Sequence, residues 1–273
     1  MTRNDPKHLL RMGQIYRYAR PERPSEPRVD GLPNFYWHTQ TDGTKKAKLE
    51  RGISRLPVVA TPAGDRVPTV LLRSTPWKAG AERVPWHDEF HQATGTVTYF
   101  GDNKIDERTN QPKAADPDDV LGNAYLRDHF REATSGDAGR RDRGGPVLLF
   151  TGVPCRGRPK GNVRFDGLGV VTEVSLVNQP ATTTRVEYFN YAFTVQLFNL
   201  AADDWSIDWR WISGRRVEIS PTGDYRKFEP SAWKQWRKDG LDALERLQLS
   251  NTPVKPLSMP SSDGGAAASR VKK

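Results

Sequence analysis

Two long stretches rich in β-branched and aromatic residues limit the fold more than any other feature of the chain. They are residues 162–177 (NVRFDGLGVVTEVSLV) and 182–200 (TTTRVEYFNYAFTVQLFNL). Valine, threonine, tyrosine and phenylalanine suit a pleated, half-buried surface. The two stretches therefore predict a pair of long strands that form the centre of a sheet.

Shorter signals surround this pair. The segments RLPVVAT and RVPTVLLRST flank the turn PAGD and predict a hairpin, and GTVTYFG and PVLLFTGV predict single strands. Helices are expected over residues 5–20, 116–134 and 229–249, with Asp5, Asp116 and Ser231 at their starts, whereas 209–219 is expected to form a turn and a strand. Many strands with few helices favour an α+β fold built on a curved sheet or open barrel.

The chain divides into four predicted parts. Residues 1–52 form a basic N-terminal arm with a short helix and a proline-rich connector, and 53–220 form the main domain. Residues 221–250 supply a C-terminal helix that packs on this domain. Residues 251–273 are of low complexity and are expected to be disordered, because they contain too few apolar residues to form a core.

The charge balance points to a polyanionic partner. Lysine and arginine number 42 against 33 acidic residues, which gives a net charge of +9. Nucleic acid is the first candidate, and a generally basic, solvated surface is the alternative. The chain has no apolar run of roughly 18 residues, and its N-terminus has no hydrophobic signal core. We therefore expect a cytoplasmic, nucleoid-associated protein with no membrane partner, and the oligomeric state is left open, with a homodimer among the options.

No convincing catalytic or metal-binding set is present in the sequence. His87 and His91 have helical i, i+4 spacing, but a third ligand is missing. Asp166 and Glu173 are the nearest match to the acids of a Mg²⁺-dependent nuclease, and the lysine of that motif is absent. The single cysteine, Cys155, excludes a disulfide framework. We predict no catalytic residue, no metal and no cofactor; a metal-dependent nuclease and a protein-interaction module are the alternatives.

The segment PWHDEFHQATGTVTYFGDNK, residues 85–104, gathers aromatic and acidic residues. Trp86 and Tyr99 can stack on a flat heterocycle, and the Asp88 carboxylate can accept a hydrogen bond from an exocyclic amine. Cytosine presents such an amine at N4. The alternative is that both aromatic residues belong to the core and that Asp88 is a cap or turn residue.

Several segments in order resemble the SET- and RING-associated (SRA) domain family, which reads modified cytosine. These are PWHDEF, GTVTYFGDNK, LGNAYLRDHF, GGPVLLF and RFDGLGVVTEV, within about residues 55–220. The chain is most similar to the SRA-like N-terminal domains of modification-dependent restriction endonucleases. This resemblance implies a curved, partly open β-barrel of SRA/PUA-like type with flanking helices.

The resemblance also implies a function and a pocket. The function is recognition of 5-methylcytosine, or 5-hydroxymethylcytosine, in double-stranded DNA by flipping the base out of the duplex. Tyr99 would stack on the flipped base, Asp88 would bind its Watson–Crick edge and Trp86 would form a second wall. Asp102, in the FGDN turn, is the rival for the acidic role. Family members often continue into a nuclease domain, so a modification-dependent endonuclease, or the reader fragment of one, is the alternative.

Basic loops are expected to contact DNA. Residues 78–85 and 103–113 flank the pocket segment, and readers of this type commonly fill the gap left by a flipped base with a loop side chain. Arg83 in the first loop, and Lys104 or Arg108 in the second, are the candidates.

A third basic loop, residues 155–162 (CRGRPKGN), is assigned to the phosphate backbone. It carries Arg156, Arg158 and Lys160, spaced by glycine and proline, and has no apolar side chain to anchor it in a core. The alternative for all three loops is an ordinary solvated surface.

Overall fold

The computed structural model describes residues 7–18, 22–40, 47–49, 51–76, 87–106, 108–158, 160–180, 187–218 and 224–249. The predictions for Trp86, Arg83 and the tail 251–273 lie outside these residues.

An eight-stranded mixed sheet forms the centre of the molecule. Its path runs β5 (Ile53–Arg55), β6 (Val70–Ser74), β9 (Val147–Gly152), β10 (Asn162–Pro180), β11 (Glu187–Leu197), β8 (Thr96–Phe100) and β7 (Glu89–His91), and β2 (Ile15–Arg17) pairs with β10 off this path. Neighbours are antiparallel except β6 and β9. Within the described residues no pairing joins β5 to β7, so the sheet stays open and a closed barrel is not formed.

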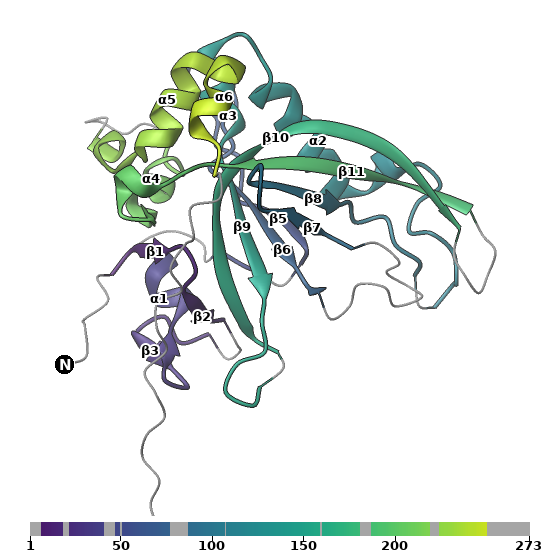
Figure 1. The fold of residues 1–273 in the computed structure, drawn as a ribbon, viewed down its shortest axis with the longest axis horizontal. Coiled ribbons are helices and arrows are strands. Elements are labelled where there is room, and N and C mark those ends of the chain that lie inside the picture. The colour runs from purple at the N-terminus through teal and green to yellow at the C-terminus, as the bar shows by residue number, and fades with distance from the viewer. Residues whose placement is uncertain are drawn as a thin grey trace, which may run out of the picture.

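The predicted long strand pair is confirmed. β10 and β11 pair from Gly169↔Leu197 out to Pro180↔Glu187, and Figure 1 shows them as one long curved ribbon that extends beyond the other strands. The predicted hairpin around PAGD is confirmed by the antiparallel pairing of β5 with β6. The strands expected in GTVTYFG and PVLLFTGV are β8 and β9.

The helix predicted over residues 5–20 is wrong over its described part. That segment forms β1 (Leu9–Arg11), which pairs with β12 (Ser206–Asp208), and β2, separated by a turn at Gly13 with φ 76°. Partner strands from far along the chain override the weak helical pattern, because they bury Leu10 and Tyr16 almost completely. Over its described residues, the arm predicted for 1–52 therefore contributes β2 to the central sheet and side chains to the hydrophobic core.

The remaining N-terminal elements are short. β3 (Arg28–Val29) and β4 (Leu32–Pro33) form a two-stranded hairpin. Helix α1 (Phe35–Thr39) follows and begins at Asn34, whose side chain accepts a hydrogen bond from the Tyr36 amide.

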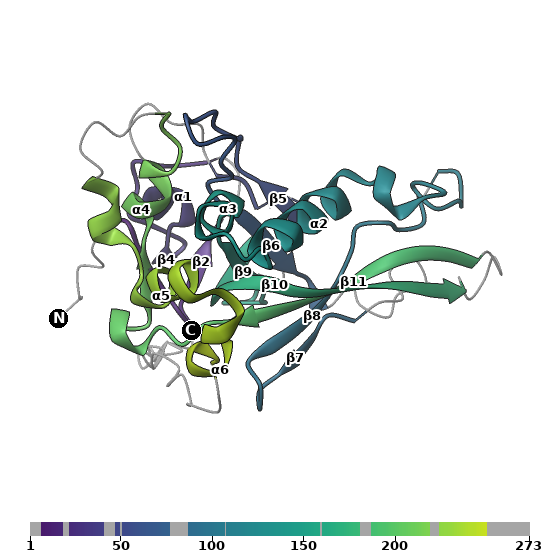
Figure 2. The same ribbon diagram turned by 90° about the horizontal axis from the view of Figure 1, so that it is seen from above.

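The helix predicted over 116–134 is confirmed. The Asp116 side chain accepts from the Asp118 amide and starts a 3₁₀ turn (Pro117–Asp119), after which α2 (Leu121–Ala133) begins. Helix α3 (Ala138–Gly144) follows, capped by Asp137. Helix α2 packs against β10 and β5, and Figure 2 shows it beside β5. Among the described residues, no helix is both long and apolar enough to span a bilayer.

The C-terminal region differs from prediction in two places. The turn and strand expected over 209–219 are instead helix α4 (Trp209–Gly214), because the Asp208 side chain caps its first turn and Trp209 and Trp211 are buried. The single helix expected over 229–249 is broken at Gly240, which has φ 65°. The result is α5 (Ser231–Asp239) and α6 (Leu244–Leu247), with 3₁₀ turns at Ala201–Asp203, Asp224–Phe228 and Gly240–Ala243.

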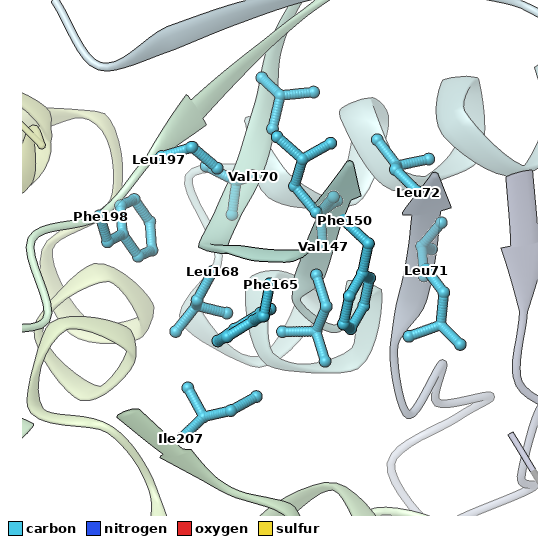
Figure 3. Packing of buried hydrophobic residues seen from close by; sticks show 14 of the residues in the cluster. Leu71, Leu72, Val147, Phe150, Phe165, Leu168, Val170, Leu197, Phe198 and Ile207 are labelled. Atoms are coloured by element: carbon cyan, nitrogen blue, oxygen red, sulfur yellow. The ribbon is translucent and has the colours of Figure 1, made fainter. Parts of the chain in front are cut away.

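The hydrophobic core lies along the central strands. Leu71, Leu72, Phe150, Phe165 and Leu168 are fully buried, and they pack together as Figure 3 shows. Because alternate side chains of a strand point to opposite faces, both faces of the central strands must be covered. Leu126 of α2 and Phe35 of α1 belong to the same buried cluster.

Candidate nucleic-acid interface

Two parts of the open sheet that are far apart along its path meet at Asp88 and Tyr99. The Tyr99 hydroxyl, from β8, donates to the Arg73 carbonyl of β6 over 3.4 Å. Asp88 accepts from the Phe100 amide at 3.0 Å and from the Ser74 hydroxyl at the end of β6. The β7–β8 pairing thus places the predicted acid next to the predicted tyrosine, and the curvature of the sheet brings both to the end of β6. We call these two residues the Asp88–Tyr99 site.

Tyr99 is deeply buried in this arrangement. Its side chain is 4% exposed and belongs to the main core cluster. Burial raises the pKa of Tyr99 well above its usual value, and the nearby Asp88 carboxylate raises it further. The Tyr99 hydroxyl is therefore neutral at physiological pH and acts as a hydrogen-bond donor.

Asp88 already bonds to protein groups. Its bond to the Phe100 amide closes the end of the β7–β8 hairpin, which is the turn role given as the alternative to base binding. Burial raises the pKa of the Asp88 carboxyl, while the bonds from Phe100 and Ser74 oppose this shift. A fixed carboxylate in a low-dielectric surrounding is also well suited to hold an amine donor.

Asp102, the rival acid, is held by two lysines instead. Its carboxylate lies 3.2 Å from the Lys104 ammonium and 3.3 Å from that of Lys113. Lys104, predicted to penetrate DNA, is thus paired in this structure. Arg108 has a side chain that is 91% exposed, with Asp106 at 3.8 Å.

Three buried asparagines support the FGDN turn, and sequence reasoning missed them. Asn123 accepts from the Asp102 amide at 2.7 Å and donates to Asn190 at 3.2 Å, and Asn190 donates to the Gly101 carbonyl at 3.0 Å. Asn103 donates to the Phe189 carbonyl at 2.8 Å. All three are fully buried. For Asn123 in α2 and Asn190 in β11, a polar residue within a partly apolar helix or strand pattern was the available signal.

The basic loop after β9 emerges at the same end of the sheet as the Asp88–Tyr99 site. β6 and β9 are parallel and Ser74 is in register with Thr151, so both strands end together. Arg156, Arg158 and Lys160 are exposed in this loop. Both arginines also contact Asp30, so they are ordered by the protein rather than fully free in solvent.

The residues of the nuclease alternative do not converge. Asp166 is bonded to Arg164 at 2.5 Å, and burial raises its pKa. Glu173 accepts from the Thr194 hydroxyl at 3.2 Å. Among the described residues, no group of three or more histidine, cysteine or acidic side chains is placed to hold a metal ion.

Comparison with solved structures finds proteins of similar fold. The fold is similar to that of the MspJI restriction endonuclease in complex with a 27-mer oligonucleotide, with a TM-score of 0.78 and 28% identity over 94% of this chain. The chain spans 58% of the length of that protein. The DNA recognition domain of the cytosine modification-dependent restriction endonuclease LpnPI has a TM-score of 0.56 and 19% identity, over 86% of this chain and 89% of its own.

Comparison with family models agrees, whereas none of the curated proteins matches. The model described as restriction endonuclease AspBHI N-terminal matches residues 62–246, more than half of the chain. The resemblance to SRA-like domains of modification-dependent restriction endonucleases is thereby confirmed. The chain belongs to the family of the N-terminal domain of the AspBHI restriction endonuclease.

Proposed function

We propose that this protein binds double-stranded DNA and recognises cytosine that carries a 5-methyl or 5-hydroxymethyl group, with the base flipped into the Asp88–Tyr99 site. The observation that carries the proposal is the meeting of Asp88 with Tyr99 at the end of the sheet that also bears the basic loop. The relation to a restriction endonuclease solved with an oligonucleotide supports a DNA partner. The role would lie in restriction of, or response to, methylated DNA.

The energetics allow this mode of recognition. Flipping a base costs a few kcal/mol of lost stacking and pairing. Aromatic stacking returns about 1–3 kcal/mol per base, and the base-edge bonds and phosphate contacts add to it. Burial of the methyl group adds only about 1 kcal/mol. Discrimination against unmodified cytosine should therefore be modest.

The test is the affinity for two duplexes of one sequence that differ only in methylation of one cytosine. We expect roughly tenfold tighter binding to the methylated duplex, because about 1.4 kcal/mol corresponds to a factor of ten. Equal affinities at physiological salt would contradict recognition of the modified base and leave a general DNA-binding protein.

The substitutions Asp88→Asn and Tyr99→Phe test whether the modified base binds at the Asp88–Tyr99 site. Each change keeps the shape of a buried side chain, whereas Tyr99→Ala would also remove a core ring at a cost of about 3–5 kcal/mol in stability. We expect Asp88→Asn to abolish most of the preference for the methylated duplex, and Tyr99→Phe to reduce it partly because stacking remains. Asp102→Asn is the matched control, since that carboxylate is held by lysines. If only Asp102→Asn reduces the preference, the base-binding acid is Asp102.

Replacing Arg156, Arg158 and Lys160 together by glutamine tests the phosphate contacts. We expect weaker binding to both duplexes alike, and a salt dependence of log K that is flatter by about two to three contacts. A control removes three positive charges from Arg140, Lys234 and Arg246, which lie on the helices at the opposite end of the molecule from the β9–β10 loop (Figure 1). An equal effect of both triple changes would show that only net charge matters.

A further inference from the structure

The tip of the β3–β4 hairpin contacts the basic loop between β9 and β10 through a hydrogen bond and an ion pair. Asp30 and Gly31 form the tip with φ values of 52° and 74°, as a tight two-residue hairpin turn requires. The Arg156 guanidinium lies against this turn and donates to the Asp30 carbonyl at 3.1 Å. A Cβ atom on Gly31 would come within 2.1 Å of Arg156 Nη1, so a side chain here would displace the Arg156 guanidinium from this position.

The Asp30 carboxylate binds two further arginines. Its Oδ2 accepts from Arg17 Nε at 2.8 Å, and its Oδ1 lies 3.3 Å from Arg158 Nη2. The Arg17 side chain is 9% exposed and also donates to the Lys160 carbonyl at 2.9 Å, so it is a structural anchor. The Arg158 side chain is 56% exposed. We call Arg17, Asp30, Arg156 and Arg158 the Asp30 cluster; the guanidinium groups of Arg17 and Arg158 contact the Asp30 carboxylate, and that of Arg156 contacts the Asp30 carbonyl.

A short run of contacts joins this cluster to the Asp88–Tyr99 site. Tyr18 follows Arg17 in the chain, and its hydroxyl accepts from Arg73 Nη1 at 2.8 Å. The Arg73 carbonyl in turn accepts from the Tyr99 hydroxyl. Through Tyr18 and Arg73 the cluster is thus connected to the Asp88–Tyr99 site.

We propose that the Asp30 cluster is a binding site for a DNA phosphate, in which Asp30 occupies the arginines in the free protein and opposes the incoming phosphate. The inference rests on the proposed DNA-binding function. Guanidinium groups pair with carboxylate and phosphate through the same forked geometry, so an incoming phosphate competes with the Asp30 carboxylate for Arg158. The Asp30 carbonyl holds the Arg156 guanidinium next to it. Asp30 also weakens binding by direct repulsion of the phosphate.

Asp30 has two opposing effects on DNA binding. Their relative sizes decide whether removing its charge strengthens or weakens binding. Asp30 orders Arg158, which favours binding, but an exposed ion pair of this kind contributes little. The repulsion acts between the Asp30 carboxylate and a phosphate that share Arg158, and it is larger at low ionic strength. Removing the negative charge of Asp30 should therefore strengthen binding to DNA.

Asp30→Asn is the direct test. Asparagine tolerates the left-handed backbone of this turn and keeps an oxygen that can accept from Arg17. We expect roughly three- to tenfold tighter binding to the methylated and the plain duplex alike at low salt, shrinking as added salt screens the charges. Asp239→Asn is the matched control, because Asp239 is also paired with an arginine, Arg246, and its side chain is 30% exposed against 31% for Asp30.

The gain should depend on the arginines. In a protein that carries Arg156→Gln and Arg158→Gln, Asp30→Asn should no longer tighten binding, a non-additivity that a change in net charge does not produce. Asp30→Gly, which also suits the positive φ, gives a second neutral variant should the asparagine variant be poorly folded.

Unchanged or weaker binding by folded Asp30 variants, or an equal gain from Asp239→Asn, would overturn the inference. The plain duplex separates this result from the proposed function. A wild-type protein that binds both duplexes equally contradicts modified-base recognition, while the Asp30 effect is still decided on the plain duplex.

Discussion

Replacing Arg215 by methionine is expected to lower the free energy of unfolding by about 3–5 kcal/mol, because it removes one partner of a buried ion pair. The Arg215 side chain is fully buried. Its Nε donates to the Pro68 carbonyl at 3.0 Å, its Nη2 to the Val67 carbonyl at 3.0 Å, and its Nη1 to Asp142 Oδ1 at 3.1 Å. Methionine fills much of the volume but leaves these acceptors without their donor.

The Arg215 guanidinium also connects separate parts of the fold. It lies 5.8 Å from the Trp211 ring centre and 5.9 Å from that of Trp233, so it joins α4 and α5 to the segment that precedes β6. Burial lowers the pKa of Arg215, whereas the Asp142 carboxylate opposes this shift. The side chain thus carries its charge in the core with Asp142 as counter-ion.

Urea denaturation followed by circular dichroism measures this effect. Arg246→Met is the control, because Arg246 pairs with Asp239 at the surface with a side chain that is 60% exposed. That pair should contribute less than about 1 kcal/mol. A loss from Arg215→Met no larger than that of the control would contradict the structural role of Arg215.

Acidification should destabilise the protein through two buried histidines. Burial lowers the pKa of His38 to about 4 and the pKa of His129 to about 4. Between these values and the usual 6.5, the unfolded chain takes up protons that the folded protein does not, so stability falls as pH falls. The loss is on the order of 3 kcal/mol per histidine between pH 6.5 and 4.

Asp88 and Asp166 act in the opposite direction, because burial raises the pKa of each carboxyl. Protonation on acidification therefore favours the folded state at these two residues and offsets part of the histidine effect at the lowest pH. The steepest loss of stability should lie between pH 6.5 and 5, above the usual range of carboxyl groups.

Urea denaturation at a series of pH values from 7.5 to 4.5 tests this expectation. His129→Gln and His38→Gln should each reduce the slope of stability against pH, even if they lower stability at pH 7.5. His91→Gln is the control, because His91 is exposed in β7. A flat profile between pH 6.5 and 5 in the unmodified protein would contradict the buried, neutral state of the two histidines.

Local patterns in the sequence determined the central elements. The β-rich stretches became β10 and β11, and Asp116 with Pro117 marked the start of α2. These elements were predictable because the strands are long and the helix start depends on neighbouring residues. The proximity of Asp88 to Tyr99 was also predictable, since both belong to one short acidic and aromatic segment of the sequence.

Only the tertiary structure decided the rest. β1 and β2 are three residues long, and their partners in β12 and β10 lie far along the chain. The contacts of Asp30 with Arg156, and of Arg215 with Pro68, join residues more than a hundred positions apart. Such pairings leave no local signal in one sequence, because they are selected by burial and by satisfaction of polar groups once the sheet has formed. The sequence therefore determined the strands and the acidic-aromatic segment, whereas sheet curvature and long-range ion pairs decided which loops lie beside that segment.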